Sequence, residues 1–258
     1  MLHESNAFPG KAVKMLSKKV DTIMVSFEDA KDRINNAKKV VCTGTPIKIQ
    51  KQIYKEDEKN KILKEYGLDN LKPIVLVYGG SQGAQKINEA LIEIIENKLN
   101  SNYQIVWATG PKQYDIIKEK LEDKKININL VPNMKIMPYI YNMEEIMNIA
   151  DLIVARSGAM TITEISNLGK ASILVPLPNV SNNHQMYNAK VLENVNAAKI
   201  IENDLLNGSL LNNTINDIVL NKENCSQMGN NAMKIAINNT KDKIYQQILE
   251  LVNIKNLK

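Results

Sequence analysis

The sequence is poor in aromatic residues, cysteine and histidine. Aromatics make up 5% of the 258 residues, and there are two cysteines and two histidines. Cys42 and Cys225 lie too far apart to match a metal or redox spacing, so reduced cytosolic thiols are expected. With only His3 and His184 present, no histidine metal site is expected. The shortage of aromatic platforms also argues against stacking on single-stranded nucleic acid.

Long apolar runs and concentrated charge are also missing. No stretch approaches the roughly 20 apolar residues of a membrane-spanning helix, and residues 1–6 contain no apolar signal core. The net charge is +5, with the lysines spread along the chain rather than gathered in one basic run. This balance suits an anionic small ligand or loose contact with an anionic membrane, and it does not favour a nucleic-acid partner.

What the chain does contain is an alternation of short β-rich runs with longer helical ones. Residues 73–78 form a continuous apolar run that ends in Gly79-Gly80, which is typical of a buried parallel strand. A helical stripe follows, with apolar residues at Ala84, Ile87, Leu91, Ile94 and Ile95. Further strands are expected at 103–108, 126–131, 152–155 and 172–175. The repetition predicts an α/β chain with a doubly wound parallel sheet.

The two ends of the chain have less of this pattern. Residues 1–43 predict a helix at 12–19 and strands at 22–25 and 39–42. That is too little for an independent core, because chains below about 40 residues seldom fold alone. These elements are therefore expected to dock on another part of the protein. Near the other end, one face of an amphipathic helix is formed by Ile244, Ile248, Leu251 and Val252.

The first candidate site is the turn Gly79-Gly80-Ser81-Gln82-Gly83-Ala84, between a strand and a helix. Glycines let backbone amides approach an anion, and the helix N-terminus adds free N–H groups and a positive dipole end. Ser81 can donate its hydroxyl to a phosphate. The alternative is a tight turn without a ligand, since the pattern is neither G-x-G-x-x-G nor a P-loop.

The second candidate is the segment 156–164, which follows the strand at 152–155 and opens a helix. Ligands of open α/β sheets bind at this end of the strands. An ionised Glu164 can accept hydrogen bonds from both ribose hydroxyls. The alternative is structural, because Thr161-x-x-Glu164 also matches a helix capping box, which needs no ligand.

The third candidate is the polar loop 176–185, which leads into a helix containing Asn188. Gln185 offers both a donor and an acceptor, as the recognition of sugar hydroxyls requires. Taken alone, this loop is better explained as a solvated connection with helix-capping asparagines.

Together, five segments resemble the motifs of MurG-type glycosyltransferases in order and spacing, over essentially the whole chain. His3–Gly10 resembles H-E-Q-N-x-x-x-G, and Thr43–Lys48 resembles the linker T-G-N-P-V-R. Gly79–Ala84 reproduces G-G-S-Q-G-A, Arg156–Glu164 matches R-S-G-A-x-T-x-x-E, and His184–Ala189 matches H-Q-x-x-N-A. The resemblance implies a GT-B fold, made of one complete Rossmann-like donor-binding domain and the remnant of a second, Rossmann-like acceptor domain.

The domain limits implied are 1–47 for the acceptor remnant and linker, 48–237 for the UDP-sugar-binding domain, and 238–258 for a helix that packs back on the acceptor domain. Family members begin with a full acceptor domain, so the resemblance describes an N-terminally truncated chain. It implies inverting transfer of N-acetylglucosamine from UDP-N-acetylglucosamine to undecaprenyl-pyrophosphoryl-muramoyl-pentapeptide, lipid I to lipid II, in peptidoglycan synthesis. The setting implied is peripheral, on the cytoplasmic side of the membrane, with no metal or other cofactor.

The resemblance also assigns roles to single residues. The diphosphate would face Ser81 and the turn 159–163, while Glu164 would hold the ribose and Ile140 the uracil. Gln185 would contact the sugar. Asn6 would reach the donor from the other domain, and Lys48 replaces a family arginine, keeping its charge without the bidentate fork. The complete predicted substrate-binding set is Asn6, Lys48, Ser81, Gln82, Ile140, Ala159, Met160, Thr161, Ile162, Thr163, Glu164 and Gln185.

The catalytic base is not identified by these motifs. A base must take the proton of the attacking hydroxyl, and the family's base lies in the missing region, which leaves His3 and Glu4 as the only nearby candidates. Three hypotheses follow: a truncated or split transferase, a non-catalytic UDP-sugar-binding module, and an epimerase of the same fold. The H-E-x-N and H-Q-x-x-N-A segments argue against the epimerase. We expect weak UDP-N-acetylglucosamine binding and no transfer by this chain alone.

Overall fold

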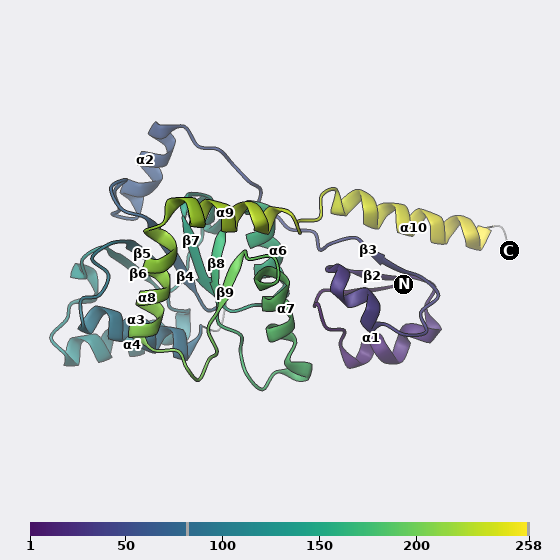
Figure 1. Cartoon of the computed structure of the whole chain (residues 1–258), viewed down its shortest axis with the longest axis horizontal. Coiled ribbons are helices and arrows are strands. Elements are labelled where there is room, and N and C mark those ends of the chain that lie inside the picture. The colour runs from purple at the N-terminus through teal and green to yellow at the C-terminus, as the bar shows by residue number, and fades with distance from the viewer. Residues whose placement is uncertain (81–82, 257–258) are drawn as a thin grey trace.

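The computed structural model describes residues 1–80 and 83–256, with side chains described up to residue 252 (Figure 1). It contains a large unit built on a six-stranded parallel sheet and a smaller unit built on a three-stranded parallel sheet. A long C-terminal helix runs beside the smaller unit (Figure 1). No described helix is both long and apolar enough to cross a bilayer.

The large sheet has a reversal in its strand order. Its strands are β4 (Ile74–Tyr78), β5 (Gln104–Ala108), β6 (Met134–Met137), β7 (Leu152–Ala155), β8 (Ala171–Leu174) and β9 (Ala198–Ile200). The spatial order is β6-β5-β4-β7-β8-β9, so the first three strands progress to one side and the last three to the other. This confirms the predicted doubly wound sheet, and it places the topological switch point between β4 and β7.

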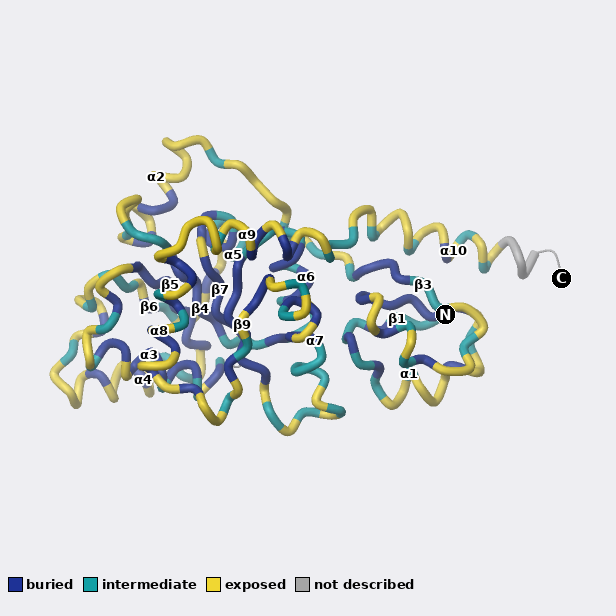
Figure 2. The backbone as a smooth tube through the Cα atoms, in the orientation of Figure 1, coloured by how far each residue is buried: buried dark blue, intermediate teal, exposed yellow. Residues whose placement is uncertain are grey.

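Helices cover both faces of this sheet. They are α2 (Glu56–Glu65), α3 (Gln85–Glu96), α4 (Pro111–Asp123), α5 (Met143–Ile149), α6 (Ala159–Leu168), α7 (His184–Glu193), α8 (Gly208–Val219) and α9 (Lys222–Met233). Along β4, Val75 and Val77 pack into the core under α3 and α8, whereas Leu76 and Tyr78 pack into the core under α5 and α6. Burial on both faces explains why the strands are continuously apolar, and Figure 2 shows the buried positions concentrated there.

One predicted strand is wrong. The run 126–131 does not join the sheet; its centre, Ile128–Leu130, forms a 3₁₀ turn, and the strand lies later, at β6. The side chain of Asn127 accepts a hydrogen bond from the N–H two residues on (2.9 Å). Such local bonds compete with strand pairing. Asn133, at φ +55°, then turns the chain into β6.

The smaller unit is formed by the first part of the chain. Its elements are β1 (Leu2–Glu4), α1 (Lys11–Leu16), β2 (Ile23–Val25) and β3 (Val40–Cys42), in the sheet order β1-β2-β3. The sequence pattern predicted β2, β3 and the helix but not β1, which has only three residues. The small core of this unit includes Ile23, Val25 and Cys42, with Ile237 packed against it from near the other end of the chain.

The two units and the C-terminal helix, α10 (Thr240–Asn256), make direct contacts. Ala7 and Phe27 belong to the same hydrophobic cluster as residues of α6 and α7. At Gly44, a Cβ atom would lie 2.7 Å from Oγ1 of Thr240, so the linker passes very close to the start of α10. Lys39 forms an ion pair with Glu250 farther along that helix. The assignment of residues 1–47 to an acceptor domain stays a prediction.

The apolar face predicted for α10 is only partly covered. Ile244 is half-buried, while Ile248 and Val252 are 43% and 47% exposed. The helix therefore keeps an apolar stripe toward solvent beside its contacts with the smaller unit.

Candidate functional site

Two of the predicted motifs meet at the switch point of the large sheet. Tyr78, the last residue of β4, is the register partner of Ala155, the last residue of β7. Gly79-Gly80 follows the first strand, and Arg156-Ser157-Gly158 follows the second. The two turns therefore open side by side at the carboxyl edge, where ligands of doubly wound sheets bind. Ser81 and Gln82 lie outside the described residues, so their predicted contacts stay predictions.

The glycine turn requires its glycines. A Cβ atom on Gly79 would collide with the backbone N of Ala84 and would lie 2.7 Å from the carbonyl carbon of Gly83. Gly80 and Gly83 have φ values of +82° and +75°, which side chains rarely adopt. Helix α3 then begins after Ala84 without a side-chain cap. The backbone is therefore packed too closely at Gly79 and Gly83 to leave room for a side chain.

The start of α6 presents unpaired backbone N–H groups. Its N-cap is Gly158, which has no side chain to cap the helix, and the first hydrogen bond back to Gly158 comes from the N–H of Ile162 (3.0 Å). The N–H groups of Ala159, Met160 and Thr161 have no acceptor among the described residues. Such groups, with the helix dipole behind them, attract anions.

The capping-box alternative for Thr161 and Glu164 is ruled out. In a capping box Thr161 would be the N-cap, but it is the third residue of α6, and Gly158 occupies the cap position. Glu164 therefore has no capping role to fulfil, and its carboxylate remains available.

Glu164 is a half-buried carboxylate without a partner. Within the described part of the chain it forms neither a hydrogen bond nor an ion pair, and burial raises its pKa to about 7. Beside it, the hydroxyl of Tyr78 is shielded from solvent and meets no hydrogen-bond partner there. Burial and the Glu164 charge both raise the pKa of Tyr78, against a smaller effect of the Thr161 hydroxyl. Unpartnered buried polar groups are unfavourable unless a ligand satisfies them, so this pair marks a candidate binding site.

Asn188 connects three of the motif segments through one buried amide. Its Oδ1 accepts a hydrogen bond from the N–H of Ala7 (2.8 Å). Its Nδ2 donates to Oδ1 of Asn6 and to the carbonyl of Ser157, each at 3.1 Å. The hydroxyl of Ser157 in turn donates to the carbonyl of Gln185 (2.8 Å). The first segment of the chain is thereby fixed against the turn after β7, which places Asn6 at the edge of the site.

The loop after β8 is held in place by two side chains. Gln185 accepts a hydrogen bond from the N–H of Leu177 through Oε1 (2.9 Å), and its Nε2 has no acceptor among the described residues. Arg156 donates to the carbonyls of Val175 and Pro176 (3.0 and 3.3 Å), and burial lowers its pKa. Sequence reasoning missed this structural role of Arg156. Gln185 keeps an amide donor for a ligand hydroxyl.

The two candidate bases, His3 and Glu4, already have structural partners. The carboxylate of Glu4 accepts hydrogen bonds from the N–H groups of Asn6 (2.9 Å) and Gly10 (2.7 Å), and from the side-chain amide of Asn6 (3.2 Å). It thus shapes the turn before α1. The Nε2 atom of His3 lies 3.0 Å from the carbonyl oxygen of Gly44. A catalytic role for either side chain stays a prediction.

The remaining predicted residues differ in accessibility. Lys48 and Met160 are exposed, whereas Ile140 is 1% exposed and Ile162 is fully buried in the core. The hydroxyl of Thr163 donates back to the carbonyl of Ala159 (2.9 Å). The side chains of Ile140 and Ile162 thus support the fold, and their roles in binding stay predictions. In the described part of the chain, no group of three or more His, Cys, Asp or Glu could hold a metal ion.

Comparison with known proteins matches residues 74–248 to the glycosyltransferase family 28 C-terminal domain. The UDP-N-acetylglucosamine–N-acetylmuramyl-(pentapeptide) pyrophosphoryl-undecaprenol N-acetylglucosamine transferase of Thermoanaerobacter sp. (strain X514) is 40% identical over 96% of this chain and 66% of its own length. The protein of the same name from Acetivibrio thermocellus is 37% identical over 99% of this chain and 67% of its own length. The chain thus spans about two thirds of these curated relatives.

Among solved structures, the crystal structure of MurG from Acinetobacter baumannii is similar with a TM-score of 0.73 and 27% identity, over 96% of this chain and 67% of that one. A putative UDP-N-acetylglucosamine 2-epimerase from Listeria monocytogenes has a TM-score of 0.67 at 16% identity, over 98% of this chain and 68% of that one, a likeness in fold alone. By its matched domain and its curated relatives, the chain belongs to the MurG family of glycosyltransferases, within glycosyltransferase family 28.

Proposed function

We propose that this chain binds UDP-N-acetylglucosamine at the carboxyl edge of the large sheet and serves its transfer to a lipid-linked muramoyl-pentapeptide. One observation carries the proposal. At the start of α6, beside the glycine turn, three N–H groups have no acceptor among the described residues. The carboxylate of Glu164 follows one helical turn later and likewise has no partner among them. This combination suits a nucleoside diphosphate, which joins an anion to a ribose diol.

Each part of the donor has a matching group in this arrangement. The diphosphate would accept hydrogen bonds from the N–H groups of residues 159–161, assisted by the dipole of α6. The ribose hydroxyls would donate to Glu164, and a sugar hydroxyl would accept from the free amide of Gln185. Asn6 would border the donor from the smaller unit, where Asn188 holds it.

The chemistry that follows is an inverting displacement. The muramoyl 4-hydroxyl attacks the anomeric carbon, and the bond from that carbon to the diphosphate oxygen breaks. UDP then leaves with the bonding electron pair. N–H groups fixed at the start of α6 would stabilise the charge that develops on the leaving diphosphate. The hydroxyl proton passes to a base that we do not assign, because His3 and Glu4 are already hydrogen-bonded elsewhere.

The proposal also includes a position in the cell. The acceptor named for the curated relatives is attached to undecaprenol, so the reaction has to take place at a membrane surface. We place it on the cytoplasmic face, with the chain bound peripherally.

Calorimetric titration of the purified chain with UDP-N-acetylglucosamine tests donor binding. The change Glu164→Ala should weaken binding by about 1–3 kcal/mol, the range for losing a hydrogen bond to a charged group. Glu119→Ala, an exposed glutamate on α4, is the matched control and should bind as the unmodified chain does. No heat of binding with the unmodified chain, or equal affinities for both variants, would refute the assignment. Transfer of labelled sugar to a lipid-linked acceptor then separates a transferase from a binding module.

A further inference from the structure

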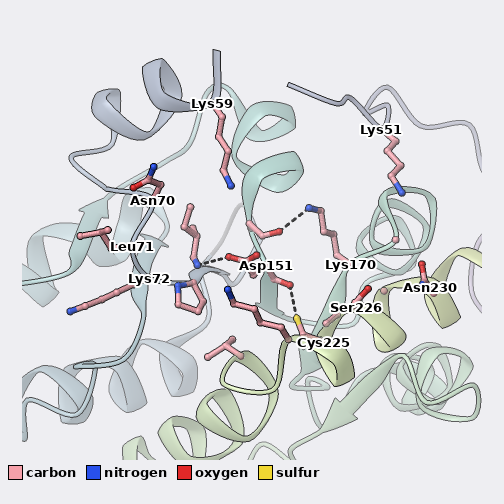
Figure 3. Close-up of a pocket in the computed structure, with 18 of the residues that line it drawn as sticks. Lys51, Lys59, Asn70, Leu71, Lys72, Asp151, Lys170, Cys225, Ser226 and Asn230 are labelled. Atoms are coloured by element: carbon pink, nitrogen blue, oxygen red, sulfur yellow. Dashed lines mark hydrogen bonds between the residues drawn. The ribbon is translucent and has the colours of Figure 1, made fainter. Parts of the chain in front are cut away.

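A cavity lies at the amino edge of the large sheet, opposite the proposed donor site (Figure 3). Its volume is about 530 Å³, within the range of small-molecule sites. Ile74, Asp151 and Ala171 line its floor, at or beside the first residues of β4, β7 and β8. Helix α9 forms one wall along its length, with the polar side chains of Ser226 and Asn230.

Five lysines from separate segments line this cavity: Lys51, Lys59, Lys72, Lys170 and Lys222. None of the five forms an ion pair within the described part of the chain, although seven such pairs occur there. Figure 3 shows Lys51 and Lys59 extending toward the cavity from the linking segment and from α2. Lys72 turns aside to donate to Asn133 (3.3 Å).

The two carboxylates that line the cavity accept hydrogen bonds from backbone N–H groups. Asp69 accepts a hydrogen bond from the N–H of Leu71, and Asp151 accepts one from the N–H of Ile74, both at 2.8 Å. Neither carboxylate forms an ion pair with a lysine in the described part of the chain. The lining residues therefore have an excess of positive charge that the protein does not neutralise by direct contact.

The position of Lys170 in this cavity shifts the pKa of its ammonium group. Its Nζ donates to the carbonyls of Asn148 (2.6 Å) and Ala150 (2.8 Å). The third N–H donor of the ammonium group has no acceptor among the described residues. Burial lowers its pKa to about 8 against the raising effect of Asp151, and the charges of Lys51 and Lys59 contribute smaller lowering effects to that value. Three ammonium groups thus repel one another around one cavity. A bound anion would relieve that repulsion.

We propose that this cavity at the amino edge is a second anion site, which binds a phosphate-bearing ligand through Lys51, Lys59 and Lys170. Lysine ammonium groups bind phosphate as point charges and need no fixed fork geometry. The hydroxyl of Ser226 and the side-chain amide of Asn230 add hydrogen-bond donors on the same wall. The phosphate can belong to a soluble molecule or to a lipid headgroup, since both present the same chemistry to these side chains.

Titration with tripolyphosphate at low salt, with UDP in excess to occupy the carboxyl edge, tests the proposal. The double variant Lys51→Gln, Lys59→Gln should bind at least about tenfold more weakly than the unmodified chain. Its matched control is Lys19→Gln, Lys199→Gln, which removes the same charge from exposed positions elsewhere. Equal affinities for the two double variants, with their thermal unfolding unchanged, would exclude a soluble phosphate ligand at this site.

Sedimentation with vesicles distinguishes the two sources of phosphate. Vesicles of phosphatidylglycerol present anionic headgroups, and vesicles of phosphatidylcholine serve as their neutral control. If only vesicle binding depends on Lys51 and Lys59, the ligand is a headgroup; if tripolyphosphate binding depends on them, it is soluble. No dependence in either arm refutes the proposal. The affinity for UDP-N-acetylglucosamine is measured alongside, so that failure of the donor site is detected separately.

Discussion

The two edges of the large sheet meet negative charge in different ways. At the carboxyl edge the proposed donors are the backbone N–H groups at the start of α6, with Glu164 as the nearby charge. At the amino edge the donors are the ammonium groups of lysines. Backbone groups are fixed by the fold and suit one ligand geometry, whereas lysines are mobile and lose side-chain entropy when they bind. We therefore expect the carboxyl edge to be selective and the amino edge to be tolerant.

Adding a methyl group at Gly79, at the carboxyl edge, should have the largest effect on stability and on donor binding. In Gly79→Ala the new Cβ would meet backbone atoms of Gly83 and Ala84, which cannot swing aside as a side chain can. We expect a loss of about 3 kcal/mol in the free energy of unfolding, measured in urea, and a loss of donor binding. Gly10→Ala is the control, because its nearest neighbour would be 3.6 Å away. Similar stabilities for the two variants would show that the turn is not tightly constrained.

Asn188→Ala should have the next largest effect. The change removes three hydrogen bonds and leaves the N–H of Ala7 without its acceptor. We expect the free energy of unfolding to fall by about 2 kcal/mol. Asn224→Ala, an exposed asparagine on α9, should leave stability nearly unchanged. If Asn188→Ala is equally mild, the smaller unit is held on the carboxyl edge by other contacts.

A change of pH should have a smaller effect on stability and donor affinity, because it changes the ionisation of Glu164. Its pKa rises from 4.5 to about 7 on folding, so the folded chain holds this proton more tightly than the unfolded chain. Stability therefore falls as the pH rises between these two values, and Glu164→Gln should flatten that part of the stability curve. Only the ionised carboxylate accepts from both ribose hydroxyls, so the affinity for UDP-N-acetylglucosamine should rise from about pH 6 to about pH 8. An equal rise in Glu164→Gln would attribute it to another group.

Replacing lysines at the amino edge should have the smallest effect, when the affinity for the sugar donor is measured. Lys51→Gln, Lys59→Gln should bind UDP-N-acetylglucosamine with the affinity of the unmodified chain in about 0.15 M salt, where distant charges are screened. A clear loss of donor affinity would mean that the two edges are coupled.

The main features of the fold could be predicted from the sequence because they repeat over several residues. The strands β4, β5, β7 and β8 are apolar runs bounded by glycine or polar residues, and α3 has a clear apolar stripe. The prediction failed at β6, where the amide of Asn127 directs the preceding apolar run into a turn. It also missed β1 and β9, which have three residues each and depend on pairing with a neighbouring strand.

The two sites also differ in how much of each can be recognised from the sequence. The turn residues at the carboxyl edge are contiguous, so Gly79–Ala84 and Arg156–Glu164 were visible as motifs. Tyr78 was not singled out, because only the folded structure shows its hydroxyl near Glu164. The amino-edge lysines come from positions far apart in the chain, where they look like scattered surface charge, and only the meeting of three strand starts brings them together.

Hydrogen–deuterium exchange with and without UDP-N-acetylglucosamine tests the central claim most directly, because it reports on both edges in one experiment. If the donor binds at the switch point, exchange should slow at the amides of residues 156–164 and in the glycine turn, while the start of α9 exchanges as before. Protection at residues 222–226 instead, or no protection at the start of α6, would contradict the account.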